Sequence, residues 1–172
     1  FDHDKGIIVD IGGGSTEIIR FEGKKVIGCI SIPYGCVSIT DVFLKNGLPP
    51  ANINISRSLD VFEQELSKYA WLENLQDTNL IGIGGTTRNL AKIQMQEIDY
   101  PFKRIHNFTM SIKDFYSLES KILKYDLKNL KKYSGLNLIM YLAFRRASWP
   151  RSYNAKSIEC SYSLMLSTSF LA

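Results

Sequence analysis

The part of the chain best suited to chemistry is the run Asp-Ile-Gly-Gly-Gly-Ser-Thr-Glu at residues 10–17. Its candidate phosphate-binding residues are Gly12, Gly13, Gly14, Ser15 and Thr16. Consecutive glycines adopt positive φ without strain and expose backbone N–H groups to an anion, and the two hydroxyls add further donors. A turn that only reverses the chain needs less than this, so we interpret the run as a phosphate-binding turn.

Two carboxylates flank these glycines, Asp10 before them and Glu17 after them. A carboxylate cannot bind a phosphate directly, because both are anions. We therefore expect Asp10 to hold Mg²⁺, or to orient a water molecule through it. Glu17 could do the same or act as a general base. Both are candidate catalytic residues, and Asp10 is the candidate metal ligand.

A second glycine-rich turn stands at residues 81–86, which read Ile-Gly-Ile-Gly-Gly-Thr. A helix that begins after such a turn offers a phosphate its unpaired N–H groups and the positive end of its dipole. Many strand-to-helix turns carry glycine only for packing, so this turn is weak evidence alone, but the two turns support each other. The residues assigned to it are Gly84, Gly85, Thr86 and Arg88.

Short β-branched runs predict the strands that carry these turns. Residues 6–11, 15–21 and 25–33 predict an antiparallel hairpin system, with a turn at 22–24. Residues 79–83 predict a fourth strand, which leads into the second glycine turn.

The sequence predicts five helices, at residues 37–44, from residue 53 onward, at 88–95, at 111–123 and at 127–133. The apolar residues of the first have mixed spacing, while helical spacing is clear from residue 53 onward. The second of these has two candidate N-caps, Asn54 and Ser56. The fourth has Ser111 as its expected cap, with Asp114 in its first turn.

Composition narrows the class of protein. The chain has 172 residues, of which 45% are hydrophobic and 22% are charged, which excludes disordered, collagen-like and coiled-coil proteins. The longest clean apolar run, residues 138–144, is far short of a membrane span. Three cysteines without metal-ligand spacing favour a reducing cytoplasm. The net charge of +4 suits an anionic partner, and we expect neither a membrane nor a nucleic-acid partner.

Three runs of residues, at 10–17, at 33–36 (Pro-Tyr-Gly-Cys) and at 82–86, together resemble the Ppx/GppA family. Its members are exopolyphosphatases and guanosine pentaphosphate phosphohydrolases. The resemblance covers residues 6–136. It implies an α/β, ribonuclease-H-like fold with a mixed sheet and flanking helices, as in actin, sugar kinases and chaperone ATPases.

The resemblance also implies roles for individual residues. Asp10, Ser15 and Glu17 match the positions of the family's second phosphate loop that are thought to bind Mg²⁺, phosphate and the attacking water. The family's catalytic glutamate and first phosphate loop belong to a first lobe, which we expect to precede Phe1 in a longer protein. The implied activity is release of terminal phosphate from inorganic polyphosphate or guanosine pentaphosphate, with the isolated chain inactive.

The end of the chain departs from the family pattern. After residue 136 the family's Arg-Ala-Asp run does not follow. We therefore expect residues 1–136 to form the second lobe of a Ppx/GppA phosphatase, and residues 137–172 to be a divergent segment. Our hypothesis for this segment is a frameshifted or altered C-terminus. Two alternatives stay open: the ATP-binding lobe of a kinase or activator ATPase, and a non-catalytic phosphate- or nucleotide-binding module. The expected partner is the missing N-terminal lobe, and a homodimer is left open.

Overall fold

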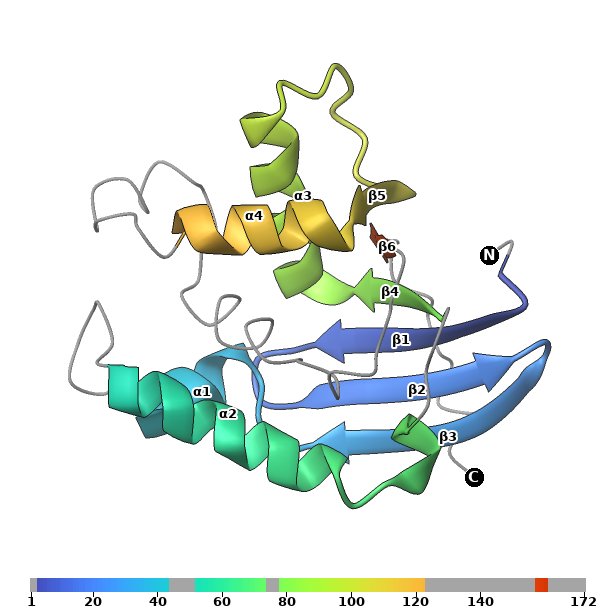
Figure 1. The fold of residues 1–172 in the computed structure, drawn as a ribbon, viewed down its shortest axis with the longest axis vertical. Coiled ribbons are helices and arrows are strands. Elements are labelled where there is room, and N and C mark those ends of the chain that lie inside the picture. The colour runs from blue at the N-terminus through green and yellow to red at the C-terminus, as the bar shows by residue number, and fades with distance from the viewer. Residues whose placement is uncertain (1–2, 44–51, 74–77, 123–156, 161–172) are drawn as a thin grey trace.

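The computed structural model describes residues 3–43, 52–73, 78–122 and 157–160, which include a six-stranded mixed sheet. Its strands are β1 (Lys5–Ile11), β2 (Thr16–Glu22), β3 (Lys25–Ile32), β4 (Asn79–Ile83), β5 (Phe108–Ser111) and β6 (Ser157–Cys160). They lie in the order β3-β2-β1-β4-β6-β5 (Figure 1). The strands predicted around both glycine turns are confirmed.

The helices beside the sheet are α1 (Cys36–Phe43), α2 (Asn52–Leu66), α3 (Gly84–Glu97) and α4 (Ile112–Ile122), and a short 3₁₀ helix η1 (Ala70–Leu72) follows α2. These four helices were predicted, although α3 begins at the glycines of the second turn rather than after them. The predicted N-caps of α2 are wrong, because Asn54 and Ser56 lie inside that helix. Ser111 does cap α4, since its Oγ accepts the N–H of Asp114 at 3.0 Å.

The register of the strands decides which side chains meet at the first glycine turn. Asp10 of β1 pairs with Glu17 of β2, which in turn pairs with Ser31 of β3. Since side chains alternate along a strand, these three share one face of the sheet. β1 also pairs in parallel with β4, so the chain leaves both strands at the same edge. The two glycine turns are therefore neighbours.

The opposite face of the three N-terminal strands carries the apolar core, which includes Ile7, Val9, Ile11, Ile18, Ile30 and Ile32. Two glycines on this face let helical segments approach closely. A Cβ on Gly28 of β3 would overlap the Trp71 indole of η1, and one on Gly82 of β4 would overlap Thr87 of α3. Both segments therefore pack directly on the strands. In Figure 1, α1 and α2 lie on the β3 side of the sheet, α3 lies beside β4, and α4 lies beside β5.

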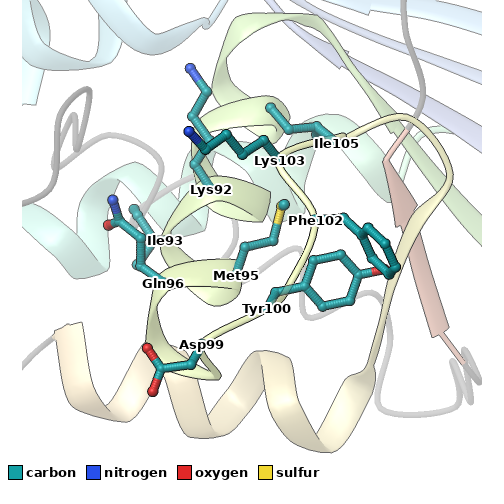
Figure 2. Close-up of a pocket in the computed structure, with 9 residues that line it drawn as sticks. All are labelled: Lys92, Ile93, Met95, Gln96, Asp99, Tyr100, Phe102, Lys103 and Ile105. Carbon is teal, nitrogen blue, oxygen red and sulfur yellow. The ribbon is translucent and has the colours of Figure 1, made fainter.

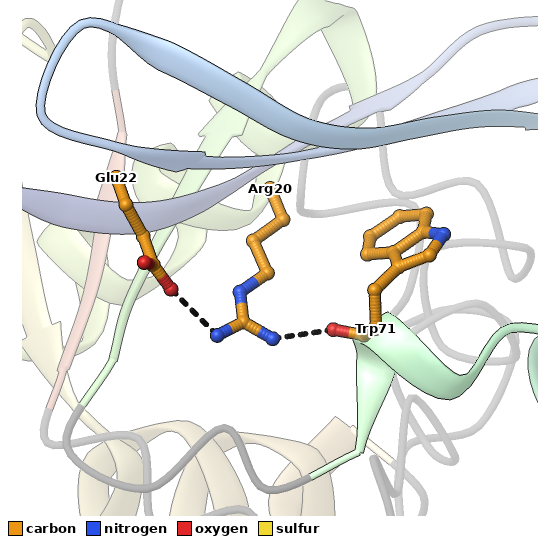
Figure 3. A network of polar contacts seen from close by, with 3 residues as sticks. All are labelled: Arg20, Glu22 and Trp71. Carbon is orange, nitrogen blue, oxygen red and sulfur yellow. Dashed lines mark hydrogen bonds and ion pairs between the residues drawn. The ribbon is translucent and has the colours of Figure 1, made fainter.

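An arginine on β2 ties η1 to the hairpin (Figure 3). The Nη1 of Arg20 donates to the carbonyl oxygen of Trp71 at 2.5 Å, and its Nη2 forms an ion pair with Glu22 at 2.6 Å. The Glu22 side chain is 46% exposed, so the ion pair alone contributes only about 0–1 kcal/mol. Its main effect is to orient the guanidinium that holds η1 in place.

The strand β6 comes from the segment that we expect to diverge from the family. It pairs in parallel with β4 and antiparallel with β5. The predicted helix at residues 127–133 lies outside the described residues, and the division of the chain at residue 136 stays a prediction. Among the helices of the described ranges, none combines the length and the apolarity that crossing a bilayer requires.

Candidate functional site

A buried hydrogen bond joins the two glycine turns. The Oγ1 of Thr86, in the first turn of α3, donates to the carbonyl oxygen of Ile11 at the end of β1, at 2.9 Å. Both residues are buried. The start of α3 is therefore fixed relative to the turn between β1 and β2.

The N-terminus of α1 binds the β1–β2 turn through the carbonyl oxygens of the turn. The N–H of Cys36 donates to Gly12 at 2.8 Å, and the next two N–H groups of the helix donate to Gly13 at 2.8 and 3.2 Å. The Oγ of Ser38 donates to Gly14 at 3.1 Å. Three consecutive carbonyl groups of the turn thus point toward α1.

The N–H groups that follow these carbonyls point the other way. In a trans peptide the C=O and the next N–H are antiparallel, so the N–H groups of Gly13, Gly14 and Ser15 point away from α1. Within the described part of the chain no acceptor binds them. Successive exposed N–H groups of this kind form a binding site for anions.

Two reasons were predicted for the three glycines, positive φ and exposed N–H groups, and the structure contradicts the first. None of Gly12, Gly13 and Gly14 has a positive φ, so the expectation that they supply positive φ is wrong. A Cβ on Gly14 would meet no atom within 4 Å, and one on Gly13 would meet only Val37, at 3.6 Å. The chain itself thus has room for side chains here, and their absence leaves the N–H groups open to close approach by a ligand.

Packing does require glycine immediately before α1. A Cβ on Gly35 would lie 2.6 Å from both the Gly12 oxygen and the Ser15 nitrogen, and 2.7 Å from the carbonyl carbon of Gly13. The N–H of Gly35 donates to Ser38 Oγ at 2.8 Å. The helix α1 reaches the carbonyl oxygens of the turn only because this position has no side chain.

Two serine hydroxyls hold Glu17 by one of its oxygens. Ser15 Oγ donates to Oε1 at 2.6 Å, and Ser31 Oγ donates to the same oxygen at 2.9 Å. No described residue binds Oε2. Glu17 is therefore fixed in orientation with one oxygen available to a water molecule or a cation.

Asp10 lies between the two turns, against the start of α3. A Cβ on Gly84 would overlap the Oδ1 of Asp10, and Gly84 also has a φ of 84°, so glycine is required there twice over. Burial and then the charge of Glu17 raise the pKa of Asp10, while Arg88 acts in the opposite direction. The charge of Glu17 is thus close enough to disfavour the charged form of Asp10.

Two of the predicted hydroxyl donors point into the protein. Thr16 is buried and its Oγ1 donates to the carbonyl oxygen of Tyr34 at 2.7 Å, and Thr86 makes the bond described above. These hydroxyls stabilise the turns and are not directed at a ligand. Arg88 is exposed, and its Nε donates to the carbonyl oxygen of Gly84 at 3.1 Å, which keeps the cation over the second turn.

The paired carboxylates fit a magnesium ion. Within the described ranges, no three His, Cys, Asp or Glu side chains gather as a metal site. Mg²⁺ needs no such cluster, because it is commonly held by one or two carboxylates and completes its shell with water and substrate phosphate oxygens. A cation beside Asp10 would also relieve the repulsion between Asp10 and Glu17. Magnesium binding by Asp10 stays a prediction.

Two site residues were not found from the sequence. Ser31 binds Glu17, and Ser38 binds both Gly14 and Gly35. Counting back from the turn at residues 22–24 would place Ile30 opposite Glu17, and only the register shift between Arg20 and Phe21 brings Ser31 there. No local pattern marks Ser38, whose role depends on how α1 docks.

A model of the Ppx/GppA phosphatase family matches residues 1–138 of the chain. Similar solved structures include a PPX-GPPA enzyme from Aquifex aeolicus, with 23% identity and a TM-score of 0.70 over 92% of this chain and 53% of that one. An exopolyphosphatase from Cytophaga hutchinsonii has 20% identity and a TM-score of 0.77 over 94% and 54%. An exopolyphosphatase-like protein has 20% identity and a TM-score of 0.74 over 94% and 57%.

The chain spans about half the length of these structures. The structural likeness confirms the predicted ribonuclease-H-like fold, that of the actin-like ATPases, with a mixed sheet and flanking helices. The family match covers the hairpin, both glycine turns and α1 to α4. The chain belongs to the Ppx/GppA phosphatase family.

Proposed function

We propose that this chain supplies a phosphate-binding turn, the one between β1 and β2, to an enzyme that releases terminal phosphate from inorganic polyphosphate or guanosine pentaphosphate. The observation that carries the proposal is the row of N–H groups at Gly13, Gly14 and Ser15, which point away from α1 beside two carboxylates. Membership of a phosphatase family supports hydrolysis as the reaction class. Since the related structures are about twice as long, the complete enzyme would need a further lobe.

Phosphoryl transfer depends mainly on positioning and on charge stabilisation, and the site's residues suit both. The N–H groups of the turn would hold the oxygens of the terminal phosphate. The free Oε2 of Glu17 would orient the attacking water, while its Oε1 stays bound to Ser15 and Ser31. Mg²⁺ at Asp10, when bound, would neutralise the negative charge of the phosphate and so reduce its repulsion by the two carboxylates.

The test is phosphate release by the complete protein that contains this chain, with Mg²⁺ and with polyphosphate, guanosine pentaphosphate or ATP. We expect release from one of the first two substrates, and the ratio of their kcat/KM values names the preferred one. Consumption of ATP alone would move the protein to the kinase and ATPase branch of the superfamily. Absence of any turnover would favour a non-catalytic binding module.

Variants of the complete protein test the assigned roles. Glu17→Gln keeps an acceptor for both serines and removes the charge, so we expect kcat to fall roughly 100-fold or more with little change in KM. Glu22→Gln, on the same strand and 46% exposed, is the matched control and should leave both constants unchanged. A rise in KM at constant kcat for Glu17→Gln would contradict the role of Glu17.

A further inference from the structure

A pocket lies well away from the glycine turns. It has a volume of about 550 Å³ and opens between the second half of α3 and the segment at residues 98–105 (Figure 2). Lys92 on its wall follows Gly84 by eight residues, which is about 12 Å along the helix at 1.5 Å per residue. The pocket is therefore separate from the candidate phosphate site, although the same helix contributes to both.

The pocket owes its shape to the way α3 ends. The N–H of Tyr100 donates to the Met95 carbonyl at 2.8 Å, and the N–H of Asp99 donates to that of Gln96 at 3.4 Å. This is the pair of bonds of a Schellman motif, with Asp99 at the left-handed position, where its φ is 47°. The motif turns the chain back along α3 and brings Tyr100 and the residues after it beside Met95.

One wall of the pocket is aromatic. Phe102 is 65% exposed and lies edge-on to Tyr100, with ring centroids 5.8 Å apart. Tyr100 is in turn packed edge-on against the buried Phe108, at 5.1 Å. The wall is thus an exposed ring supported by an anchored one, and a planar ligand could stack on it.

The same pocket is lined by two lysines from different segments, Lys92 of α3 and Lys103 of the returning chain. In Figure 2 the two side chains come from different directions, and their ammonium groups lie on the same side of the pocket, away from Asp99. Neither ammonium group forms an ion pair with any described residue. An anion bound there would meet two positive charges at once.

We propose that this pocket binds a nucleoside monophosphate, with the base stacked on the exposed ring of Phe102 and the phosphate between Lys92 and Lys103. The pocket volume falls within the range of about 300–1,000 Å³ that small-molecule sites occupy, and a few convergent charged groups beside an apolar wall are typical of such sites. The proposal is independent of the hydrolase function, because it uses none of the residues of the glycine turns.

The experiment is a set of calorimetric titrations of the 172-residue chain, one with adenosine monophosphate, one with adenosine and one with inorganic phosphate. We expect the nucleotide to bind more tightly than either of its parts. Lys92→Gln and Lys103→Gln should each weaken nucleotide binding about 5- to 10-fold, as expected for the loss of one charge-assisted contact at a partly exposed site. Phe102→Ala should weaken adenosine binding as well, and Lys113→Gln, an exposed lysine outside the pocket, is the matched control.

Two outcomes would overturn the proposal. The first is no binding of adenosine monophosphate, or binding that the double variant Lys92→Gln/Lys103→Gln leaves unchanged. The second is binding that is weakened by Gly14→Ala but not by the lysine variants, which would place the nucleotide at the glycine turns. Neither outcome decides the proposed hydrolysis, which is measured separately as phosphate release by the complete protein.

Discussion

The glycine before α1 allows a test of how the phosphate-binding turn is built. Gly35→Ala places a methyl group 2.6–2.7 Å from atoms of Gly12, Gly13 and Ser15, all of them backbone. Backbone atoms cannot move aside as a flexible side chain can, so the helix must separate from the turn. We expect a loss of about 1–3 kcal/mol in the free energy of unfolding, the usual range for overpacking.

The matched control is Gly14→Ala in the same turn. Its Cβ meets nothing within 4 Å and its φ lies outside the left-handed region, so alanine fits without strain. Such a substitution stabilises a protein by about 0.4–1 kcal/mol through the entropy of the unfolded chain. Gly14→Ala should therefore be at least as stable as the wild type, yet should weaken phosphate binding because its methyl group obstructs close approach to the N–H groups.

Urea unfolding of the 172-residue chain measures the change in stability caused by Gly35→Ala and by Gly14→Ala. At about 2–4 °C per kcal/mol for a chain of this size, Gly35→Ala should also lower Tm by roughly 2–12 °C. The reasoning about the turn is refuted if Gly35→Ala is as stable as the wild type. It is equally refuted if Gly14→Ala is the more destabilising of the two, because alanine would then not fit into the open space seen at that position.

Three further changes test single contacts. Since burial and the Glu17 charge raise the pKa of Asp10, the folded chain binds the proton more tightly than the unfolded chain, and stability falls as pH rises from the ordinary value of 3.8 through the folded-state pKa. Asp10→Asn should therefore be more stable than the wild type at pH 7 in urea unfolding. This difference in stability should disappear well below pH 3.8. Mg²⁺ should reduce it at pH 7, because Mg²⁺ stabilises the wild type alone. Thr86→Val removes the buried bond between the turns and should cost about 1–3 kcal/mol by the same assay. Asp99→Gly removes the strain of an aspartate with a left-handed backbone and should raise the free energy of unfolding by about 0.5–1 kcal/mol. An unchanged or lower Tm would show that Asp99 is not strained.

The sequence was sufficient for elements that are determined by local signals. The hairpin of β1 and β2 follows from alternating β-branched residues around a glycine turn, and the cap of α4 follows from Ser111 three residues before Asp114. The start of α3 could not be predicted in this way. It begins with two glycines, which are poor helix formers, and its N-cap residue Ile83 offers no side-chain bond. Tertiary contacts fix it instead, namely the packing of Thr87 on β4 and the bond from Thr86 to β1.

The candidate site shows the same division between local and tertiary information. Asp10, Glu17 and the glycines were identified because their types and spacing imply phosphate chemistry. The roles of the two threonines were not, since whether a hydroxyl faces a ligand or the core depends on strand alternation and on what packs below. Ser38 contributes through the docking of α1, which no local pattern encodes.

The glycines of this chain are required for three physical reasons, and the difference bears on how the site would bind phosphate. Gly35 is required by close packing, Gly84 by a left-handed backbone beside Asp10, and Gly14 by neither. The folded chain has room for a side chain at Gly14. Its absence is explained most simply by a ligand that must approach the backbone closely. Because the carbonyl groups on either side are already bound to α1, the N–H groups of the turn are oriented before any ligand arrives. The binding energy of a phosphate would then not be spent on ordering the loop.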